Sequence, residues 1–436
     1  MIMVAQRLHR LGIRRSRVYR RAVNRCGGLL VRQMSFSIIL VLCSGLANGA
    51  SPADKPHVAP KQADPAYLAT LVDDNPNPLP RGFSAEEQAN FVPAWIPAQI
   101  RSPPTASVRA QAEYEPTDGI LVRWGSFTSV ITAMAVPLTT AAHPANVYVV
   151  VTGASQQASA STALTGAGAD MSHIRFITQP CSNSNACSVW MRDYGPRFIN
   201  DGGHRGIVDH TYNRPSRTID NAFPALLASS WNEPRYAIPL VHGGGNFHLF
   251  RNRDAFMTRL VANENPGVSE QQIKDDYLQY QGLNVTLTDP FPSNYDSTQH
   301  IDMWMLGLGD IKVLIGEYTA AEGGGVPKTV TDNTANLMAS RGYNVYRTPG
   351  WSSNGTHYTY TNSVIVNQTA LICRFGGSNT TRDAQALVTY QAAMPGYDIV
   401  AVDCSGIITS AGAIHCIVMH VPDLVFRDGG EASTDD

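Results

Sequence analysis

Two apolar runs around a polar turn open the most regular stretch of the sequence, Asn362-Ser363-Val364-Ile365-Val366-Asn367-Gln368-Thr369-Ala370-Leu371-Ile372-Cys373-Arg374-Phe375. We expect strands at 362–366 and 371–375, because both runs are short, rich in apolar residues and separated by turn residues. A helical pattern follows near 382–394, and another apolar run covers 398–402. The stretch therefore predicts one strand–strand–helix–strand unit.

The same order of elements begins 62 residues earlier in the chain. There the predicted strands are 300–305, 311–316 and 343–347, and the predicted helix is 330–341. The chain from about Arg109 has room for five such units, which favours an α/β ring of repeats. Two accidental similarities within an ordinary α/β sheet are the alternative. Nearer the N-terminus we expect strands at 120–124, 147–151 and 173–177, and a helix at 126–142.

The composition excludes a disordered or fibrous protein, because 43% of the 436 residues are hydrophobic and only 16% are charged. The formal net charge of -2 averages two different segments. Nine of the 33 basic residues precede Met34, and no acidic residue precedes Asp54. Without its first 50 residues the chain carries 24 basic and 35 acidic side chains, a net charge of -11. An acidic chain of this kind does not suggest a nucleic-acid partner.

The first 50 residues have the three parts of a secretory signal: a basic leader, a short apolar run at 36–43 and small residues through Ala50. The run is too short to span a bilayer. We therefore expect a signal peptide at 1–50, with Met34 as an alternative start, and a secreted or periplasmic mature protein without a membrane anchor. Residues 51–108 are rich in proline and predict an extended arm or pro-segment. The folded domain would cover 109–436.

Cleavage after Ala50 would leave five cysteines. In an exported protein an odd number leaves at least one thiol free or paired between chains. Cys181 could pair with Cys187, and Cys373 could pair with Cys404, although the sequence does not decide the pairing. Cys416 is then the candidate left over.

Three short stretches combine ionisable residues with apolar neighbours. In Trp190-Met191-Arg192-Asp193-Tyr194-Gly195-Pro196, the Asp193 carboxylate could face a cleft, and Trp190 could form a flat wall for a planar cation. A surface turn is the alternative. In Ala411-Gly412-Ala413-Ile414-His415-Cys416-Ile417-Val418, a thiol follows a small-residue turn and precedes an apolar strand. Attack by Cys416 needs the thiolate, which a cationic substrate or a protonated histidine favours. A buried, unreactive cysteine is the alternative.

The third stretch is Ser297-Thr298-Gln299-His300-Ile301-Asp302-Met303-Trp304. In a strand, residues two apart share a face, so His300 and Asp302 would enter one cavity together. A metal-binding pair competes with this interpretation, but the sequence shows no third ligand at a recognisable spacing such as His-Glu-x-x-His. We therefore expect no metal or other cofactor. A core histidine held by a neighbouring carboxylate remains the simplest alternative.

Taken in order, Trp-x-Arg-Asp-Tyr-Gly-Pro, Gln-His-Ile-Asp, Tyr-Thr-Asn and Ile-His-Cys resemble the agmatine deiminase and bacterial-type peptidylarginine deiminase family. The stretches 297–302 and Tyr212-Asn213-Arg214-Pro215 are most similar to its exported peptidylarginine deiminases. The resemblance spans about 112–422. It implies the pentein fold, a five-bladed α/β propeller with pseudo-fivefold ββαβ repeats, which agrees with the repeat in the sequence.

The resemblance also implies a chemistry, the hydrolysis of a guanidinium to a ureido group with loss of ammonia. Asp193 and Asp302 would grip the guanidinium nitrogens. Cys416 would attack the guanidinium carbon and form a covalent thiouronium adduct. His300 would protonate the departing ammonia and then activate water. Asn362 would position the nucleophile or the intermediate.

The expected substrate contacts come from the same resemblance. Trp190 would wall the substrate, and two arginines would bind the α-carboxylate of a C-terminal arginine. Arg214 matches the first of these arginines, whereas a serine stands at the second position and Arg217 follows one residue later. Either Arg217 takes over or the carboxylate contact is weakened. The glycine-rich stretch 242–247 could line the site or form a plain turn.

We expect a secreted, metal-independent peptidylarginine deiminase that makes citrulline in peptides or proteins. The alternative within the family is an agmatine deiminase, which converts agmatine to N-carbamoylputrescine. Export and Arg214 argue against it, because agmatine has no carboxylate. A cysteine peptidase and an inactive secreted binding protein are remoter alternatives. Paired carboxylates do not suit a neutral amide, and none of the five expected catalytic residues is missing.

Overall fold

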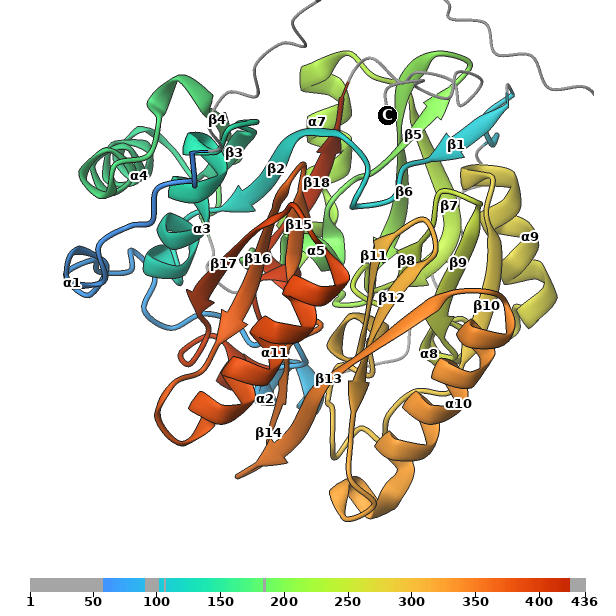
Figure 1. Ribbon diagram of the computed structural model, residues 1–436. Coiled ribbons are helices and arrows are strands. Elements are labelled where there is room, and N and C mark those ends of the chain that lie inside the picture. The colour runs from blue at the N-terminus through green and yellow to red at the C-terminus, as the bar shows by residue number, and fades with distance from the viewer. Residues whose placement is uncertain (1–57, 91–101, 106, 183–185, 424–436) are drawn as a thin grey trace, which may run out of the picture. The chain divides into compact units, whose positions relative to one another are not determined.

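The computed structural model describes residues 58–90, 102–105, 107–182 and 186–423 (Figure 1). The predicted signal peptide at 1–50 lies outside the described residues. The described residues all belong to one compact unit of the chain, which begins at Pro56.

The stretch at 362–402 forms the predicted unit. Strand β15 (Val364–Val366) pairs antiparallel with β16 (Thr369–Arg374), and β16 pairs in parallel with β17 (Asp398–Asp403). Helix α11 (Thr380–Ala393) joins the two parallel strands, because parallel neighbours need a crossover between them. The ββαβ order expected from the sequence is confirmed here.

Four further sheets of the described chain repeat this order of one antiparallel and one parallel pairing. Three of them follow the chain in the order strand, strand, helix, strand. The first is β5 (Arg197–Asp201), β6 (His204–Tyr212), α7 (Phe223–Trp231) and β7 (Arg235–His242), and the second is β8 (His248–Leu249), β9 (Asp254–Thr258), α9 (Glu270–Gln281) and β10 (Asn284–Thr288). The third is β11 (Met305–Gly309), β12 (Lys312–Glu317), α10 (Val326–Ser340) and β13 (Asn344–Ser353). Strands β1 (Val108–Ala110) and β14 (Thr356–Thr359) each extend one of these sheets. The chain is thus a mixed α/β protein built from a repeated unit.

The remaining sheet joins the two ends of the domain. Strand β18 (Met419–Pro422) pairs antiparallel with β2 (Thr117–Arg123), which runs parallel to β3 (Asn146–Val151) across helix α3 (Thr128–Thr140). Helix α4 (Ala154–Ala167) then leads to β4 (Ile174–Thr178). Cys416 lies just before β18, so pairing with β2 anchors the segment that carries it.

The helices lie outside the strands, as α9, α10 and α11 do in Figure 1. Strands that pack beneath such helices are apolar along their length, because both of their faces are covered. Within β3, for example, Val147, Val149, Val150 and Val151 are fully buried. This explains why the parallel strands appear as continuous apolar runs in the sequence.

The predicted strand at 300–305 is wrong at its start. Residues Ile301–Met303 form a 3-10 turn, and the strand begins only at Met305. Just before the turn, Gln299 adopts a left-handed backbone with a φ of 57°, a conformation that is uncommon for a residue other than glycine. His300 and Asp302 therefore do not share a strand face. The other predicted elements overlap the observed ones.

The arm is more ordered than its proline content predicts. It contains α1 (Pro65–Leu68) and α2 (Ala85–Ala89), and α2 begins with a capping box between Ser84 and Glu87. Its Asp73 carboxylate accepts hydrogen bonds from the backbone amides of Phe127 and Thr128, at 2.9 and 2.8 Å, and so caps α3. The described arm is thereby fixed to the domain ahead of Arg81, which is fully buried.

Candidate active site

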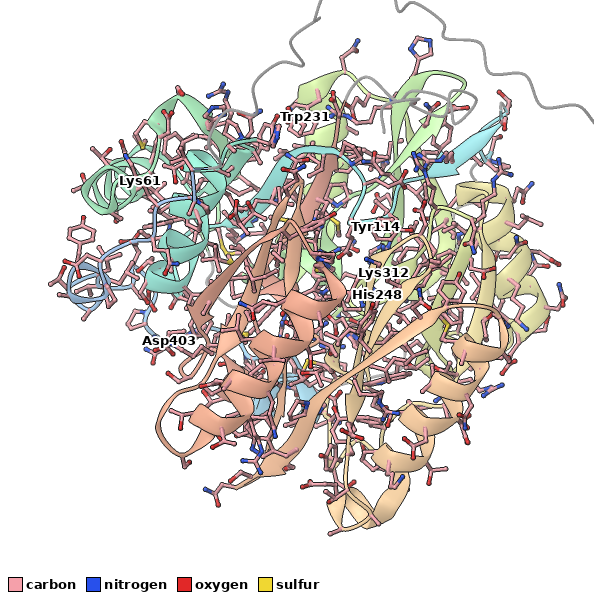
Figure 2. The ribbon with its side chains drawn as sticks, in the orientation of Figure 1. Lys61, Tyr114, Trp231, His248, Lys312 and Asp403 are labelled. Carbon is pink, nitrogen blue, oxygen red and sulfur yellow. A yellow bond between two sulfur atoms is a disulfide. The ribbon has the colours of Figure 1, made fainter. Side chains whose placement is uncertain are left out.

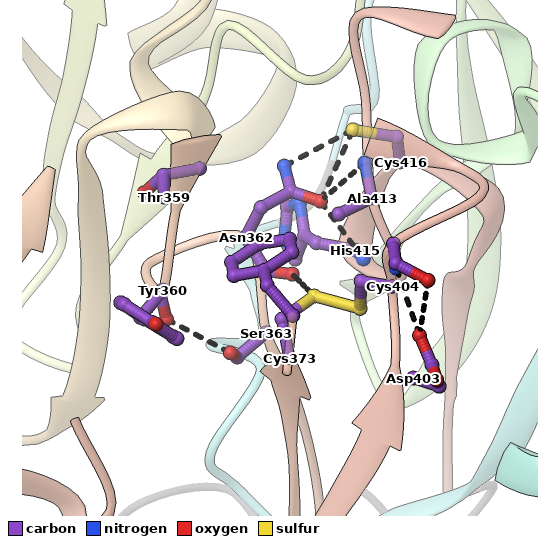
Figure 3. Close-up of a disulfide and its surroundings, with 12 residues drawn as sticks. Thr359, Tyr360, Asn362, Ser363, Cys373, Asp403, Cys404, Ala413, His415 and Cys416 are labelled. Carbon is purple, nitrogen blue, oxygen red and sulfur yellow. Dashed lines mark hydrogen bonds between the residues drawn. A yellow bond between two sulfur atoms is a disulfide. The ribbon is translucent and has the colours of Figure 1, made fainter. Parts of the chain in front are cut away.

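Cys416 lies in a 3-10 turn (His415–Ile417) immediately before β18, and its side chain is fully buried. The Asn362 amide faces it: Nδ2 lies 3.0 Å and Oδ1 lies 3.2 Å from Cys416 Sγ (Figure 3). Asn362 Oδ1 also accepts hydrogen bonds from the backbone amides of Ala413 and His415, both at 3.1 Å. One amide side chain thus positions both the thiol and the turn that carries it.

Both candidate disulfides are present, Cys181–Cys187 and Cys373–Cys404, and Cys416 is the free cysteine of the described chain. Figure 3 shows the second disulfide close to Asn362, below it in this view. The Cys373 sulfur lies 4.0 Å from the Asn362 carbonyl oxygen. The bridge therefore supports the backbone from which the Asn362 amide reaches Cys416.

The Asp193 and Asp302 carboxylates meet in the same buried space, although neither lies on a strand. Asp193 belongs to the short helix α5 (Met191–Tyr194) and Asp302 to the 3-10 turn, and their side chains are at most 1% exposed. The backbone of Gly245 links them: its N–H donates to Asp193 Oδ1 at 3.1 Å, and its carbonyl accepts from the Asp302 N–H at 3.3 Å. The predicted pairing of the two carboxylates is therefore present, by a different local geometry.

The space between the carboxylates is filled by the guanidinium of Arg81, which comes from the arm. Arg81 Nε and Nη2 donate to the two oxygens of Asp193, both at 3.0 Å. Nη2 also donates to Asp302 Oδ2 at 2.9 Å and lies 2.7 Å from Nδ1 of His300. Because an arginine nitrogen only donates, His300 Nδ1 is the acceptor. Three of the predicted polar residues, Asp193, His300 and Asp302, thus surround a guanidinium, and sequence reasoning had not placed Arg81 there.

Two glycines make room for this side chain. A Cβ atom at Gly245 would lie 1.8 Å from Arg81 Nη2 and 2.8 Å from an oxygen of each carboxylate. A Cβ atom at Gly412 would lie 2.9 Å from Cys416 Sγ and 3.0 Å from Arg81 Cδ. Neither position tolerates a larger residue without movement. The glycine-rich stretch 242–247 therefore lines the site and is not a plain turn.

The charges in the site depend on one another. Burial raises the pKa of the Cys416 thiol, and Asp302 and Asp193 raise it further, whereas the positive charge of Arg81 opposes them. Burial also disfavours the charged form of Asp193, but Arg81 holds the pKa of this carboxyl well below its usual range. Arg81 has the same net effect on the pKa of Asp302, together with His415. A guanidinium therefore stabilises every anion of this site.

A second set of ionisable residues contacts Asp302, and the sequence did not predict its role. His415 Nδ1 lies 2.9 Å from Asp302 Oδ2, and His415 Nε2 lies 2.9 Å from Glu113 Oε2. Each ring nitrogen of His415 therefore lies within hydrogen-bond distance of a carboxylate. Glu113 is also paired with Arg192 Nη1 at 2.6 Å. These partners lie too far apart in the sequence for any spacing rule to group them.

The same residues include the one described group that could hold a metal ion. Ligand atoms of Glu113, His248 and His415 lie within 4.8 Å of one another. His248 lies on β8 (labelled in Figure 2), and burial lowers its pKa to about 4, which leaves its ring neutral near pH 7. In this structure both nitrogens of His415 lie 2.9 Å from a carboxylate oxygen.

Arg214 and Arg217 lie at the site, and both contact the arm. Arg214 Nη2 donates to the Arg81 carbonyl at 3.3 Å, and its guanidinium stacks 4.3 Å from the centre of the Phe83 ring. Arg217 forms a two-pronged ion pair with Glu87, at 2.9 and 2.8 Å. Trp190 donates from Nε1 to the Leu79 carbonyl at 2.7 Å. The three predicted substrate-contact residues are thus brought together around the arm.

Two comparisons of the sequence point to one family. The sequence model of the Porphyromonas-type peptidyl-arginine deiminase family matches residues 109–422. A Legionella pneumophila (strain Paris) protein named "Putative agmatine deiminase" is 26% identical over 270 residues, which cover 57% of this chain and 76% of that protein. A Streptomyces avermitilis protein of the same name is 24% identical over 266 residues, which cover 54% and 74% of the two chains.

Solved structures share the fold. The agmatine deiminase of Enterococcus faecalis aligns with a TM-score of 0.63 at 18% identity, over 75% of this chain and all of that one. The C. jejuni agmatine deiminase aligns with a TM-score of 0.59 at 15% identity, over 73% and 96% of the two chains. At this identity the likeness establishes the fold alone.

Proposed function

The chain belongs to the Porphyromonas-type peptidyl-arginine deiminase family and is a hydrolase of amidine C–N bonds, and from this premise we propose that Cys416 converts a substrate guanidinium to a ureido group and ammonia. One observation carries the proposal: the guanidinium of Arg81 lies between Asp193 and Asp302, beside His300. A substrate guanidinium has the same shape and charge and would make the same contacts.

The first half of the reaction forms a bond between Cys416 Sγ and the guanidinium carbon. The substrate charge favours the thiolate, because it opposes the burial that raises the pKa of Cys416. The two carboxylates hold the planar cation still, which converts the attack into a step within one complex. The bond from the carbon to one terminal nitrogen then breaks. His300 passes the proton lost by the thiol to this nitrogen, which leaves as ammonia.

The second half of the reaction releases the product. A water takes the place of ammonia beside His300, which removes a proton from it as the oxygen attacks the same carbon. The bond from the carbon to Cys416 Sγ breaks, and the thiol is restored. Asn362 contacts Sγ through both atoms of its amide and would keep the sulfur aimed at the carbon in both steps. One guanidinium and one water thus give one ureido group and one ammonium.

Two substrates compete for this site. The names of the curated relatives favour agmatine, and so the comparisons support the alternative from the sequence better than the peptidyl substrate. Arg214 favours the peptidyl substrate, because it donates to the carbonyl of the arginine that occupies the site. Agmatine has no carbonyl or carboxylate at that position.

The experiment measures ammonia release and identifies the products by mass spectrometry. The substrates are agmatine, a peptide with an internal arginine and a peptide that ends in arginine. We expect ureido products, and we expect none when Cys416→Ser removes the nucleophile. Faster turnover of agmatine than of both peptides would assign the chain as an agmatine deiminase. Cleavage of a peptide bond without citrulline would instead assign a cysteine peptidase.

The arrangement and location of the protein are part of the same proposal. The five ββαβ sheets support a five-bladed propeller with pseudo-fivefold symmetry. The features of residues 1–50 support export to the periplasm or medium. Among the described residues, no helix combines the length and apolar character needed to cross a membrane. Sequencing the N-terminus of the protein recovered outside the cytoplasm tests the export proposal.

A further inference from the structure

Residues 79–83 of the arm, Leu79-Pro80-Arg81-Gly82-Phe83, pass through the site as a peptide that continues on both sides of Arg81. We call this segment the arm peptide. The domain holds its backbone at successive residues: Trp190 Nε1 donates to the Leu79 carbonyl at 2.7 Å, and the Ser410 carbonyl accepts from the Arg81 N–H at 3.1 Å. These contacts use only backbone atoms of the arm peptide, so they do not depend on its side chains.

Two arginines of the domain complete this backbone recognition. Arg217 Nη2 donates to the carbonyls of Pro80 and Gly82, at 2.8 and 2.9 Å, which flank the reactive position. Arg214 Nη2 donates to the carbonyl of Arg81 itself at 3.3 Å. The arm peptide is therefore bound as an internal arginine of a substrate protein would be bound.

The guanidinium of Arg81 is placed for the reaction and not merely for an ion pair. Nη2 is the nitrogen that lies 2.7 Å from His300. Nη1 is buried and has no hydrogen-bond partner in the structure. Cys416 Sγ and the Arg81 side chain both lie against Gly412, as the 2.9 and 3.0 Å distances from a Cβ there indicate. Nη2 is thus the nitrogen that His300 can convert to a leaving group.

We propose that Arg81 is a site of self-modification, at which the enzyme converts its own arm arginine to citrulline. The inference rests on the proposed function and deepens it, because it names an internal peptidyl arginine as a substrate. A bond forms between Cys416 Sγ and Arg81 Cζ, and the Cζ–Nη2 bond breaks to release ammonia. Water then adds its oxygen to Cζ, the bond to sulfur breaks, and the thiol is restored. The net change is one water consumed and one ammonium released, with no oxidant or reductant.

Conversion of Arg81 would open the site. Citrulline is neutral, so it cannot balance the two buried carboxylates that now hold Arg81. Buried charges without a partner are unfavourable, and a neutral side chain exchanges more easily with a cationic substrate from solution. The arm would then block the site only until Cys416 itself converts Arg81 to citrulline.

The first experiment reads the chemical state of residue 81 in the purified protein. Citrulline is identified by its mass and by the loss of tryptic cleavage between residues 81 and 82. We expect citrulline at residue 81 in the native protein, and arginine in the Cys416→Ser variant. Arg253, which is exposed, is the internal control and should stay arginine. Arginine at residue 81 in the native protein, or equal conversion of Arg253, would overturn the proposal.

A mixing experiment tests whether the reaction occurs within one chain. A tagged Cys416→Ser protein is incubated with the native enzyme, and residue 81 of the tagged chain is examined. We expect it to remain arginine, because it is fully buried in its own site. Complete conversion of the tagged chain would show that the arm reacts from solution, which contradicts the placement that carries the proposal.

Two substitutions connect the modification to turnover of an added substrate. Arg81→Lys keeps the positive charge but cannot be deiminated, whereas Arg81→Gln is neutral and resembles citrulline. We expect Arg81→Lys to turn over an arginine peptide at roughly one tenth of the rate of Arg81→Gln or less. The lysine would keep its charge, so only a small fraction of the Arg81→Lys molecules would have an open site. Equal rates would show that the arm does not control the site.

The activity of Arg81→Gln and the state of residue 81 in the native protein together separate the two proposals. If Arg81→Gln releases ammonia from an added guanidino substrate while residue 81 of the native protein stays arginine, the proposed function stands and self-modification is wrong. If Arg81→Gln, with native-like folding by circular dichroism, releases ammonia from none of the three added substrates and residue 81 of the native protein is unchanged, both proposals fail.

Discussion

Two buried arginines join the arm to the domain, and one belongs to the arm whereas the other belongs to the domain. In the first pair, which we call the Arg81 clamp, the arm supplies Arg81 and the domain supplies Asp193 and Asp302. In the second, the Arg217 clamp, the domain supplies Arg217 and the arm supplies Glu87. Both guanidiniums are fully buried, and both are gripped through two nitrogens by the two oxygens of one carboxylate.

The surroundings of the two clamps differ more than the clamps themselves. The Arg217 guanidinium also donates to two arm carbonyls, and Glu87 accepts further hydrogen bonds from Ser84 and Ser216. The Arg81 guanidinium instead faces His300 and lies near a thiol. Under the proposed function, a bidentate ion pair serves attachment in one place and holds the reacting group in the other, and the neighbouring groups decide which.

The largest expected effect comes from neutralising one carboxylate of each clamp and comparing the activity of the two variants. We expect Asp302→Asn to lower kcat/KM for an added guanidino substrate by about a hundredfold or more, because removing one partner of a buried charge pair costs about 3–5 kcal/mol. Glu87→Gln should leave the same constant equal or higher, because Glu87 holds only the arm. Steady-state ammonia release measures both.

The assay is run in the Arg81→Gln background, so that a change in arm release does not alter the result. A loss of activity in Glu87→Gln as large as that in Asp302→Asn would mean that the Arg217 clamp also acts on the reacting group. The prediction that the Arg217 clamp serves only to attach the arm would then be wrong.

Arg214 gives a smaller effect that depends on the substrate. Its contact with the Arg81 carbonyl predicts that Arg214→Ala raises KM for an internal-arginine peptide by about two- to tenfold, since one hydrogen bond contributes about 0.5–1.5 kcal/mol. Agmatine lacks the carbonyl, so its KM should change little. The test compares KM for both substrates in the Arg81→Gln background. An equal rise for agmatine would assign Arg214 to the fold of the site and not to peptide recognition.

The repeat and the residues that meet around Cys416 could be predicted from the sequence, but not the arrangement that joins them. Apolar runs such as 364–366 and 371–375 predict strands because both faces of these strands are buried. The motifs around Asp193, Asp302, Asn362 and Cys416 mark residues that the structure brings together. The turn at Ile301–Met303 was missed, because it depends on the left-handed backbone of Gln299, which the residue type does not predict.

Contacts between distant residues were invisible for a different reason. Arg81 lies in a proline-rich segment with no periodic pattern, and its partners Asp193 and Asp302 are 112 and 221 residues away. Glu113 and His415 are separated by 302 residues. Only the packing of the arm and the pairing of β18 with β2 bring such groups together. The carboxylates alone indicate that the site takes a cation, without identifying which one occupies it.

The smallest predicted effect concerns the attachment of the arm at low pH. Burial disfavours the charged form of Glu87, but hydrogen bonds from Arg217, Ser216 and Ser84 outweigh it and lower the pKa of Glu87 to about 2. A carboxyl group with a lowered pKa stabilises the folded state above its ordinary pKa, and this contribution is lost as the pH falls toward the folded value. The Arg217 clamp should therefore weaken between about pH 4.5 and about pH 2.

Hydrogen exchange of the α2 amides, measured by mass spectrometry across this range, reports the attachment. We expect exchange, after correction for its intrinsic pH dependence, to become faster as the pH falls in the native protein. In Glu87→Gln it should be faster at pH 6 already and change less with pH, because glutamine does not titrate. The amides of α9, which is distant from the arm in sequence, provide the matched control. The same pH dependence in both proteins would mean that another group holds the arm, and that the two clamps do not share the work of attachment as their geometry indicates.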